Sequence, residues 1–174
     1  MTDTSIEARL RRLEDIEEIK KLKALCCLLV DREDRDGFAG LFLEDGEFIG
    51  AFQRLRGREA LRQVRFWPFM VHYVSNPIIE VSGDTASGIW YFLRPYTAED
   101  GRPYWASGQY EDDYRRAADG WRFKTVRITN FFACPYRDGW ASKKRDAVSR
   151  LAPPVKKPSH GKPRTGRSIE MRDK

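Results

Sequence analysis

The sequence predicts an α+β fold in which helices pack on one face of a curved antiparallel sheet and enclose a pocket. Three features of the 174-residue chain predict it. Apolar residues have helical spacing near the start, short alternating segments fill the later part, and Asp-Gly or Gly-Asp pairs separate those segments. Helices followed by consecutive hairpin strands are typical of α+β domains. The expected order of elements is α-α-β-α-β-β-β-β.

The first predicted element is a long helix over residues 4–32. Thr4-Ser5-Ile6-Glu7 has the form of a capping box, in which a hydroxyl and a carboxylate satisfy free N–H groups of the first turn. Apolar side chains then recur at steps of three and four, which is the period of one helical face. They are Ile6, Leu10, Leu13, Ile16, Ile19, Leu22, Cys26 and Leu29.

Two shorter helices are predicted on either side of the first strand. One covers residues 36–43 and is ended by the turn-forming residues Glu44-Asp45-Gly46. The other covers residues 57–64, where good helix formers follow a glycine.

The strands are predicted from apolar and polar alternation between turn signals. Their ranges are 47–52, 71–81, 85–96, 104–115 and 121–132. Gly83-Asp84, Asp100-Gly101 and Asp119-Gly120 separate the last four, and such pairs favour tight hairpin turns. These four strands are therefore expected to form an antiparallel meander.

Composition and charge divide the chain into one domain, residues 1–140, and a basic tail, residues 141–174. The tail is rich in Lys, Arg, Pro, Ser and Gly and has too few apolar residues to form a core, so it is expected to be flexible. It contains eleven Lys or Arg and three Asp or Glu, a net charge of +8, so the whole-chain +6 leaves −2 for the domain. A mildly acidic domain argues against nucleic acid as a partner.

Other sequence signals limit the location and the cofactors. There is no secretory signal pattern and no apolar run of roughly 18 residues, so a cytoplasmic location is expected, without membrane attachment. The three cysteines have no disulfide or zinc-site spacing, and there is no glycine-rich phosphate loop. The sequence therefore predicts neither a metal nor another cofactor.

His72 is the main candidate for acid-base chemistry, because histidine is the side chain that exchanges protons near neutral pH. The only other histidine, His160, lies in the tail. Alternation places His72 on one strand face with Val74, so its side chain is expected to point inward. It is either a half-buried structural histidine or a base, and a base needs a partner.

Asp31 is the candidate partner. It follows the apolar run Leu28-Leu29-Val30 at the end of the first helix, where the helix dipole disfavours a carboxylate. Charge pattern alone favours another interpretation, a surface acid within the cluster of charged residues 31–36.

Several segments of residues 6–135 together resemble SnoaL-like proteins of the nuclear-transport-factor-2-like superfamily. The matching segments are 15–24, Asp31, Phe38-Ala39-Gly40-Leu41-Phe42 with Asp45, His72-Tyr73-Val74-Ser75-Asn76-Pro77, 81–88, Trp90-Tyr91, 110–114 and Gly120-Trp121-Arg122-Phe123. The resemblance implies a cone-shaped sheet around an interior pocket. It also implies similarity to enzymes of the bile-acid 7α-dehydratase and scytalone dehydratase type.

The resemblance implies roles for three residues. His72 falls where these enzymes have the general base that removes a carbon-bound proton, and Asp31 where they have the carboxylate that orients it. Arg127 falls where the bile-acid enzyme has an arginine. It is expected inside the cone, on the strand face of Trp121 and Phe123. The alternative is an ion pair with an Asp or Glu of the neighbouring strand. The implied reaction is that of a cofactor-independent lyase or isomerase.

Two departures affect the predicted pocket, because Cys26 replaces a tyrosine of the bile-acid enzyme and Arg94 replaces an acid. The residues expected to contact a small, largely apolar cyclic substrate, such as a steroid or polyketide, are Tyr73, Trp90, Tyr91, Tyr110 and Cys26. A non-catalytic binding or assembly module is the alternative. A homo-oligomer is expected, with a trimer favoured by the resemblance and a dimer possible.

Overall fold

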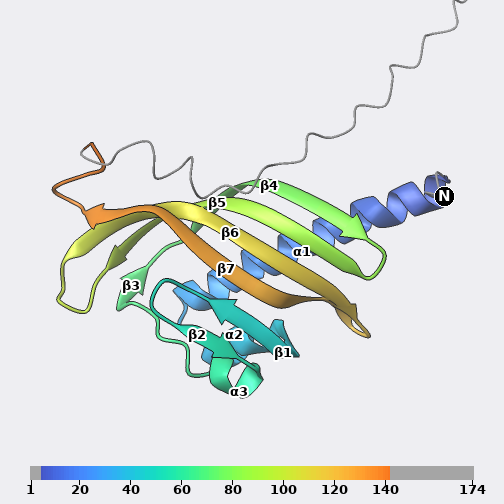
Figure 1. The fold of residues 1–174 in the computed structure, drawn as a ribbon, viewed down its shortest axis with the longest axis horizontal. Coiled ribbons are helices and arrows are strands. Elements are labelled where there is room, and N and C mark those ends of the chain that lie inside the picture. The colour runs from blue at the N-terminus through green and yellow to red at the C-terminus, as the bar shows by residue number, and fades with distance from the viewer. Residues whose placement is uncertain (1–4, 142–174) are drawn as a thin grey trace, which may run out of the picture.

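Seven strands form one curled mixed sheet, and a long helix runs along one of its faces (Figure 1). The computed structural model describes residues 5–141, so the predicted tail lies outside the described residues except for Ala141. The elements are α1 (Ile6–Asp31), α2 (Arg35–Gly40), β1 (Phe42–Ile49), β2 (Arg54–Arg56), α3 (Arg58–Leu61), β3 (Phe69–Met70), β4 (Tyr73–Ser82), β5 (Thr85–Thr97), β6 (Pro103–Ala117) and β7 (Gly120–Pro135).

The strand order explains how the sheet closes around an interior. It is β2-β1-β7-β6-β5-β3, with β4 also paired to β5. The hairpins β4-β5, β5-β6 and β6-β7 are antiparallel, as the turn residues predict. β1 lies parallel to β7, so the first long strand extends the far edge of the meander. The predicted α+β class is confirmed, although the short strands β2 and β3 were not predicted.

Helix α1 begins and ends close to the predicted positions. The Ser5 hydroxyl accepts a hydrogen bond from the Ala8 N–H at 3.1 Å, which caps the first turn. The apolar spacing runs along the whole helix, but burial does not. Ile19 is fully buried, whereas Ile6 and Leu13 are 76% and 61% exposed. Only the later part of α1 packs on the sheet and can therefore build an interior site.

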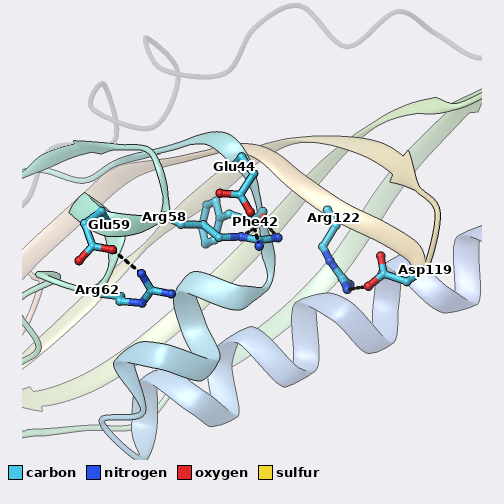
Figure 2. Close-up of polar contacts among 7 residues, drawn as sticks. All are labelled: Phe42, Glu44, Arg58, Glu59, Arg62, Asp119 and Arg122. Carbon is cyan, nitrogen blue, oxygen red and sulfur yellow. Dashed lines mark hydrogen bonds and ion pairs between the residues drawn. The ribbon is translucent and has the colours of Figure 1, made fainter.

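The predicted turn at residues 44–46 lies inside β1, where the pairing with β7 is irregular between Phe42 and Glu47. Arg58 of α3 holds this stretch. Its Nε and one terminal nitrogen donate to the Phe42 carbonyl at 2.9 and 2.8 Å, and the other bonds the Glu44 carboxylate at 2.5 Å (Figure 2). The turn residues thus produce a bulge, and an arginine from the next helix stabilises it.

Aromatic rings fill the core where α2 and β1 meet the end of β6 and the start of β7. Phe38 contacts Phe42 with ring centroids 5.0 Å apart, Phe42 contacts Phe123 at 5.2 Å, and Tyr114 contacts Phe123 at 5.1 Å. All four are buried. Phe38 also contacts Phe48 and Phe66, so this aromatic cluster reaches the pocket described below.

Within residues 5–141, no helix has the length and apolar character that a membrane span requires.

Candidate functional site

A pocket of about 320 Å³ lies between the C-terminal half of α1, the segment around β2 and β3, and the inner face of the sheet. Most of its wall is apolar, with a few polar side chains among them, which is the usual composition of a small-molecule site. The apolar wall includes Val30, Phe48, Phe52, Val64, Phe66, Trp67, Met70, Val126 and Ile128, and the polar groups include Lys23, Gln53, Arg65, His72, Arg94, Glu99, Tyr110 and Asn130.

His72 and Asp31 are brought together at this pocket. Asp31 is the last residue of α1, and His72 lies in the two-residue link between β3 and β4. The Asp31 Oδ1 atom is 2.6 Å from His72 Nδ1, and Asp31 Oδ2 accepts the His72 backbone N–H at 3.0 Å. One carboxylate therefore fixes both the ring and the backbone of His72. The predicted contact between the two side chains is present.

The environment of His72 keeps its imidazole neutral near neutral pH. Its side chain is 4% exposed, and that of Asp31 is 21% exposed. Burial lowers the pKa of His72 below its ordinary value, and the charges of Arg94 and Lys23 act in the same direction, whereas Asp31 opposes them. With Asp31 accepting from Nδ1–H, the lone pair of the neutral ring resides on Nε2.

Lys23 supplies a second buried polar group to the pocket wall. Its Nζ is 2.8 Å from Asp112 Oδ2, and the two side chains are 2% and 0% exposed. The Tyr114 hydroxyl donates to the same oxygen at 2.9 Å and accepts from Trp90 Nε1 at 3.0 Å. Burial raises the pKa of Asp112, while Lys23 and Tyr114 counteract this effect. The network ties α1 to β5 and β6.

Arg94 of β5 also lines the pocket, but its charge has no acidic partner. Its Nε atom is buried and makes no hydrogen bond, and its guanidinium lies 5.6 Å from the Phe92 ring and 5.3 Å from the Tyr96 ring. Two aromatic faces thus hold a cation inside the pocket wall. Asn130 of β7 has a buried, unpartnered Oδ1 in the same pocket.

Arg127 is not in the pocket, so its predicted position is wrong. It is exposed, while Val126 and Ile128 line the pocket. The cause is a bulge: Phe123 pairs with Tyr114 and Thr125 with Asp113, so β7 has one extra residue there. The extra residue reverses the alternation after Phe123 and turns Arg127 outward.

Three of the predicted substrate contacts also lie outside this pocket. Tyr73 and Tyr91 are 61% and 44% exposed and border a separate shallow hollow that only His72 shares with the pocket. Strand alternation explains this, because Tyr91 lies between the buried Trp90 and Phe92. Trp90 is buried, but it bonds Tyr114 in the core and does not line the pocket.

Tyr110 and Cys26 do line the pocket. The Lys23 ammonium lies 3.3 Å from the centre of the Tyr110 ring, a cation–π contact. Burial raises the pKa of the Cys26 thiol far above its ordinary value, so Cys26 is a small apolar wall residue and not a nucleophile.

Sequence reasoning gave no site role to Lys23 or Arg94, although both carry a signal. Lys23 is four residues after Ile19 and three before Cys26, which puts it on the buried face of α1. Arg94 follows Trp90 and Phe92 at steps of two, which puts it on the inner face of β5. Asn130 could not be placed this way, because it follows the bulge in β7. Residues 5–141 contain no group of three or more side chains suited to bind a metal.

Comparison with known proteins gives the family. The SnoaL-like domain model matches residues 11–127. A protein of unknown function from Mycobacterium tuberculosis is 30% identical over 69% of this chain and 73% of its own, with a TM-score of 0.59. A hexachlorocyclohexane dehydrochlorinase from Novosphingobium barchaimii is 22% identical over 73% of this chain and 93% of its own, with a TM-score of 0.67.

A scytalone dehydratase-like protein from Novosphingobium aromaticivorans is 22% identical over 72% of this chain and 89% of its own, with a TM-score of 0.65. No curated protein sequence matches the chain. The two likenesses at 22% identity support the fold, and the model that matches residues 11–127 covers more than half of the sequence. The chain therefore belongs to the SnoaL-like domain family.

Proposed function

We propose that this protein is a cofactor-independent lyase or isomerase of the dehydratase type, which removes a carbon-bound proton from a small, largely apolar cyclic substrate such as a steroid or polyketide. The observation that carries the proposal is the buried His72 imidazole, held by Asp31 at the wall of a mostly apolar pocket. A neutral imidazole with one fixed tautomer is suited to act as a general base.

The proposed step begins with attack of His72 Nε2 on a proton next to a carbonyl group. The C–H electron pair moves into the carbon skeleton, and the resulting enolate either expels a leaving group or is reprotonated at another carbon. The Asp31 carboxylate stabilises the imidazolium formed in this step. In the isomerase reaction, that imidazolium returns the proton, so no further acid is required.

The enzyme names of two structural neighbours agree with this proposal, since one is a dehydrochlorinase and the other a scytalone dehydratase-like protein. A specific observation favours a second candidate, a non-catalytic binding module. The only carboxylate in the pocket wall, among the described residues, is Glu99, and it is paired with Arg65. Elimination therefore has no unpaired carboxylic acid in the pocket wall to assist a leaving group.

Hydrogen–deuterium exchange tests the base without knowledge of the leaving group. Cyclic ketones such as 2-tetralone and cyclohexenones are incubated with the protein in D₂O, and loss of the proton signal next to the carbonyl is followed by NMR. We expect the wild type to accelerate exchange, and His72→Ala to reduce the acceleration by at least roughly 100-fold. Asp31→Asn should reduce it as well, because an amide does not stabilise the imidazolium.

Arg115→Gln serves as the control, since Arg115 is exposed on β6 away from the pocket wall. Undiminished exchange in His72→Ala would show that the base is misassigned. Ketones that bind without any exchange would favour the binding module.

A further inference from the structure

We propose that Arg94 binds a carboxylate group carried by the ligand of this pocket, so that the ligand is an organic anion with an apolar ring. This inference rests on the pocket being the substrate site, and it adds a substrate class to the proposed function. It is carried by the position of Arg94, by its lack of partners and by the charge balance of the pocket wall.

The position of Arg94 is built into β5. Trp90, Phe92, Arg94 and Tyr96 follow one another at steps of two on the inner face of this strand. Three of these four residues are buried aromatics. An arginine in this row places a permanent positive charge where the fold elsewhere puts an aromatic ring.

No protein group satisfies that charge. Arg94 has no hydrogen bond and no ion pair among the described residues, and its Nε is buried from solvent. Its guanidinium lies near the rings of Phe92 and Tyr96, which orient it and take up none of its hydrogen-bond donors. A buried donor without a partner costs free energy, and a bound acceptor recovers it.

The other charges of the pocket wall are paired. Lys23 is bonded to Asp112, and Arg65 to Glu99. His72, the remaining ionisable base, is neutral near neutral pH and bonded to Asp31. Among the described residues of the pocket wall, Arg94 is therefore the one charged side chain without a bonded partner, and a carboxylate on the ligand would supply that partner. A carboxylate suits a guanidinium, because its two oxygens match the planar fork of donors.

Arg94 and His72 line the same pocket, so an anion at Arg94 orients the rest of the ligand towards the imidazole. Phe66, Trp67 and Val126 of the same pocket wall offer apolar contacts for a ring.

Matched pairs of small ligands test the inference by binding alone. The pairs are 2-naphthoate with 2-naphthamide, benzoate with benzamide, and cyclohexanecarboxylate with its amide, measured by calorimetry on the full chain. We expect at least one carboxylate to bind more tightly than its amide. Arg94→Gln should weaken that carboxylate roughly 10- to 100-fold and leave the amide nearly unchanged, and Arg94→Lys should retain part of the preference.

Arg115→Gln removes the same charge at an exposed position and should leave the carboxylate preference intact. A second readout is the pKa of His72 followed by NMR, which should rise when the carboxylate binds, because the ligand offsets the positive charge of Arg94. A purely structural role for Arg94 would not produce this change.

The inference is overturned if no pair shows a carboxylate preference, or if the preference survives Arg94→Gln. His72→Ala separates this result from the proposed function, because it should abolish proton exchange and keep carboxylate binding. Exchange that depends on His72 without a carboxylate preference would retain the proposed function and reject the anion site.

Discussion

At the scale of single residues, the pairing of His72 with Asp31 determines how the site responds to pH. Asp31 uses both carboxylate oxygens on the same residue, one on the ring and one on the backbone N–H. The ring is therefore fixed relative to the end of α1 by two bonds. Removing the carboxylate should change both the position and the basicity of the imidazole.

We predict that activity is lost on the acidic side only below pH 6.5. Burial lowers the pKa of His72 from its ordinary value of 6.5, so the imidazole stays neutral in the folded protein until the pH falls below that value. The unfolded chain binds this proton more readily, so the free energy of unfolding should also decrease as the pH falls from 6.5 towards the lowered pKa. The pH profile of exchange and an NMR titration of the His72 ring measure the first effect, and urea unfolding at several pH values measures the second.

Asp31→Asn should move the acidic limb to still lower pH, because the carboxylate is the group that raises the pKa of His72. The His72→Asn spectrum identifies the ring signal for this titration. An acidic limb above pH 6.5, or a limb unchanged in Asp31→Asn, would contradict this description of the pair.

At the scale of elements, the packing of α1 on the sheet depends on the buried pair of Lys23 and Asp112. We predict that Lys23→Met destabilises the fold by roughly 3–5 kcal/mol, because it leaves a buried carboxylate without its cation. Lys20→Met is the matched control on the same helix. Lys20 pairs with Glu17 at side-chain exposures of 40% and 61%, and such a pair contributes about 1 kcal/mol or less.

Urea unfolding of the two variants compares these costs directly. The double variant Lys23→Met with Asp112→Leu should recover part of the lost stability, because it removes both charges. Equal costs for Lys23→Met and Lys20→Met would show that the buried pair does not hold α1 on the sheet.

The bulges of β7 position the inner face of the sheet, and Gly108 is essential to one of them. The register between β6 and β7 shifts between Ser107 and Gly108. A Cβ atom on Gly108 would lie 2.1 Å from the Thr129 carbonyl oxygen and 2.9 Å from the Asn130 Cα. Both are backbone atoms that cannot move aside as a side chain can.

We therefore predict that Gly108→Ala costs at least about 2 kcal/mol in the free energy of unfolding, with the cavity wall at Asn130 displaced. Gly40→Ala is the control, since no atom lies within 4 Å of its added Cβ at the end of α2. That substitution should be neutral or stabilise the protein by up to about 1 kcal/mol. A small effect for Gly108→Ala in thermal unfolding would mean that the two strands separate easily at this bulge.

These bulges also explain how far the sequence predicts the site. Turn pairs and helical spacing predict α1 and the β4–β7 meander, because those signals are local. Two-residue alternation along β5 puts Arg94 on the inner face and Tyr91 on the outer face, so the prediction of Tyr91 as a substrate contact is wrong and the inward position of Arg94 was missed. It fails for Arg127, because the extra residue in β7 depends on cross-strand pairing that leaves no local pattern. The contact between Asp31 and His72 spans 41 positions, and only the family resemblance predicts it.

At the scale of the whole molecule, the helices leave apolar side chains of the sheet in contact with solvent. Tyr73, Tyr91 and Leu93 are 61%, 44% and 39% exposed on β4 and β5. They lie side by side, since Tyr73 pairs with Leu93 and Ser75 with Tyr91 in the β4-β5 register. Contiguous apolar patches on monomers are usually small, and larger ones mark interfaces.

We predict that this patch joins copies of the chain, with a trimer as the expected assembly. Leu93→Glu combined with Tyr91→Glu places two charges in the contact and should shift sedimentation towards the monomer. Ile6→Glu, at the 76% exposed start of α1, is the control for adding a charge to an apolar surface. If Ile6→Glu alone dissociates the protein, the interface lies on α1. If the wild type is monomeric at micromolar concentration, the prediction of an oligomer is wrong. Because the patch lies on the opposite side of β5 from Arg94, the monomeric variant should keep the pocket and its ligand preference.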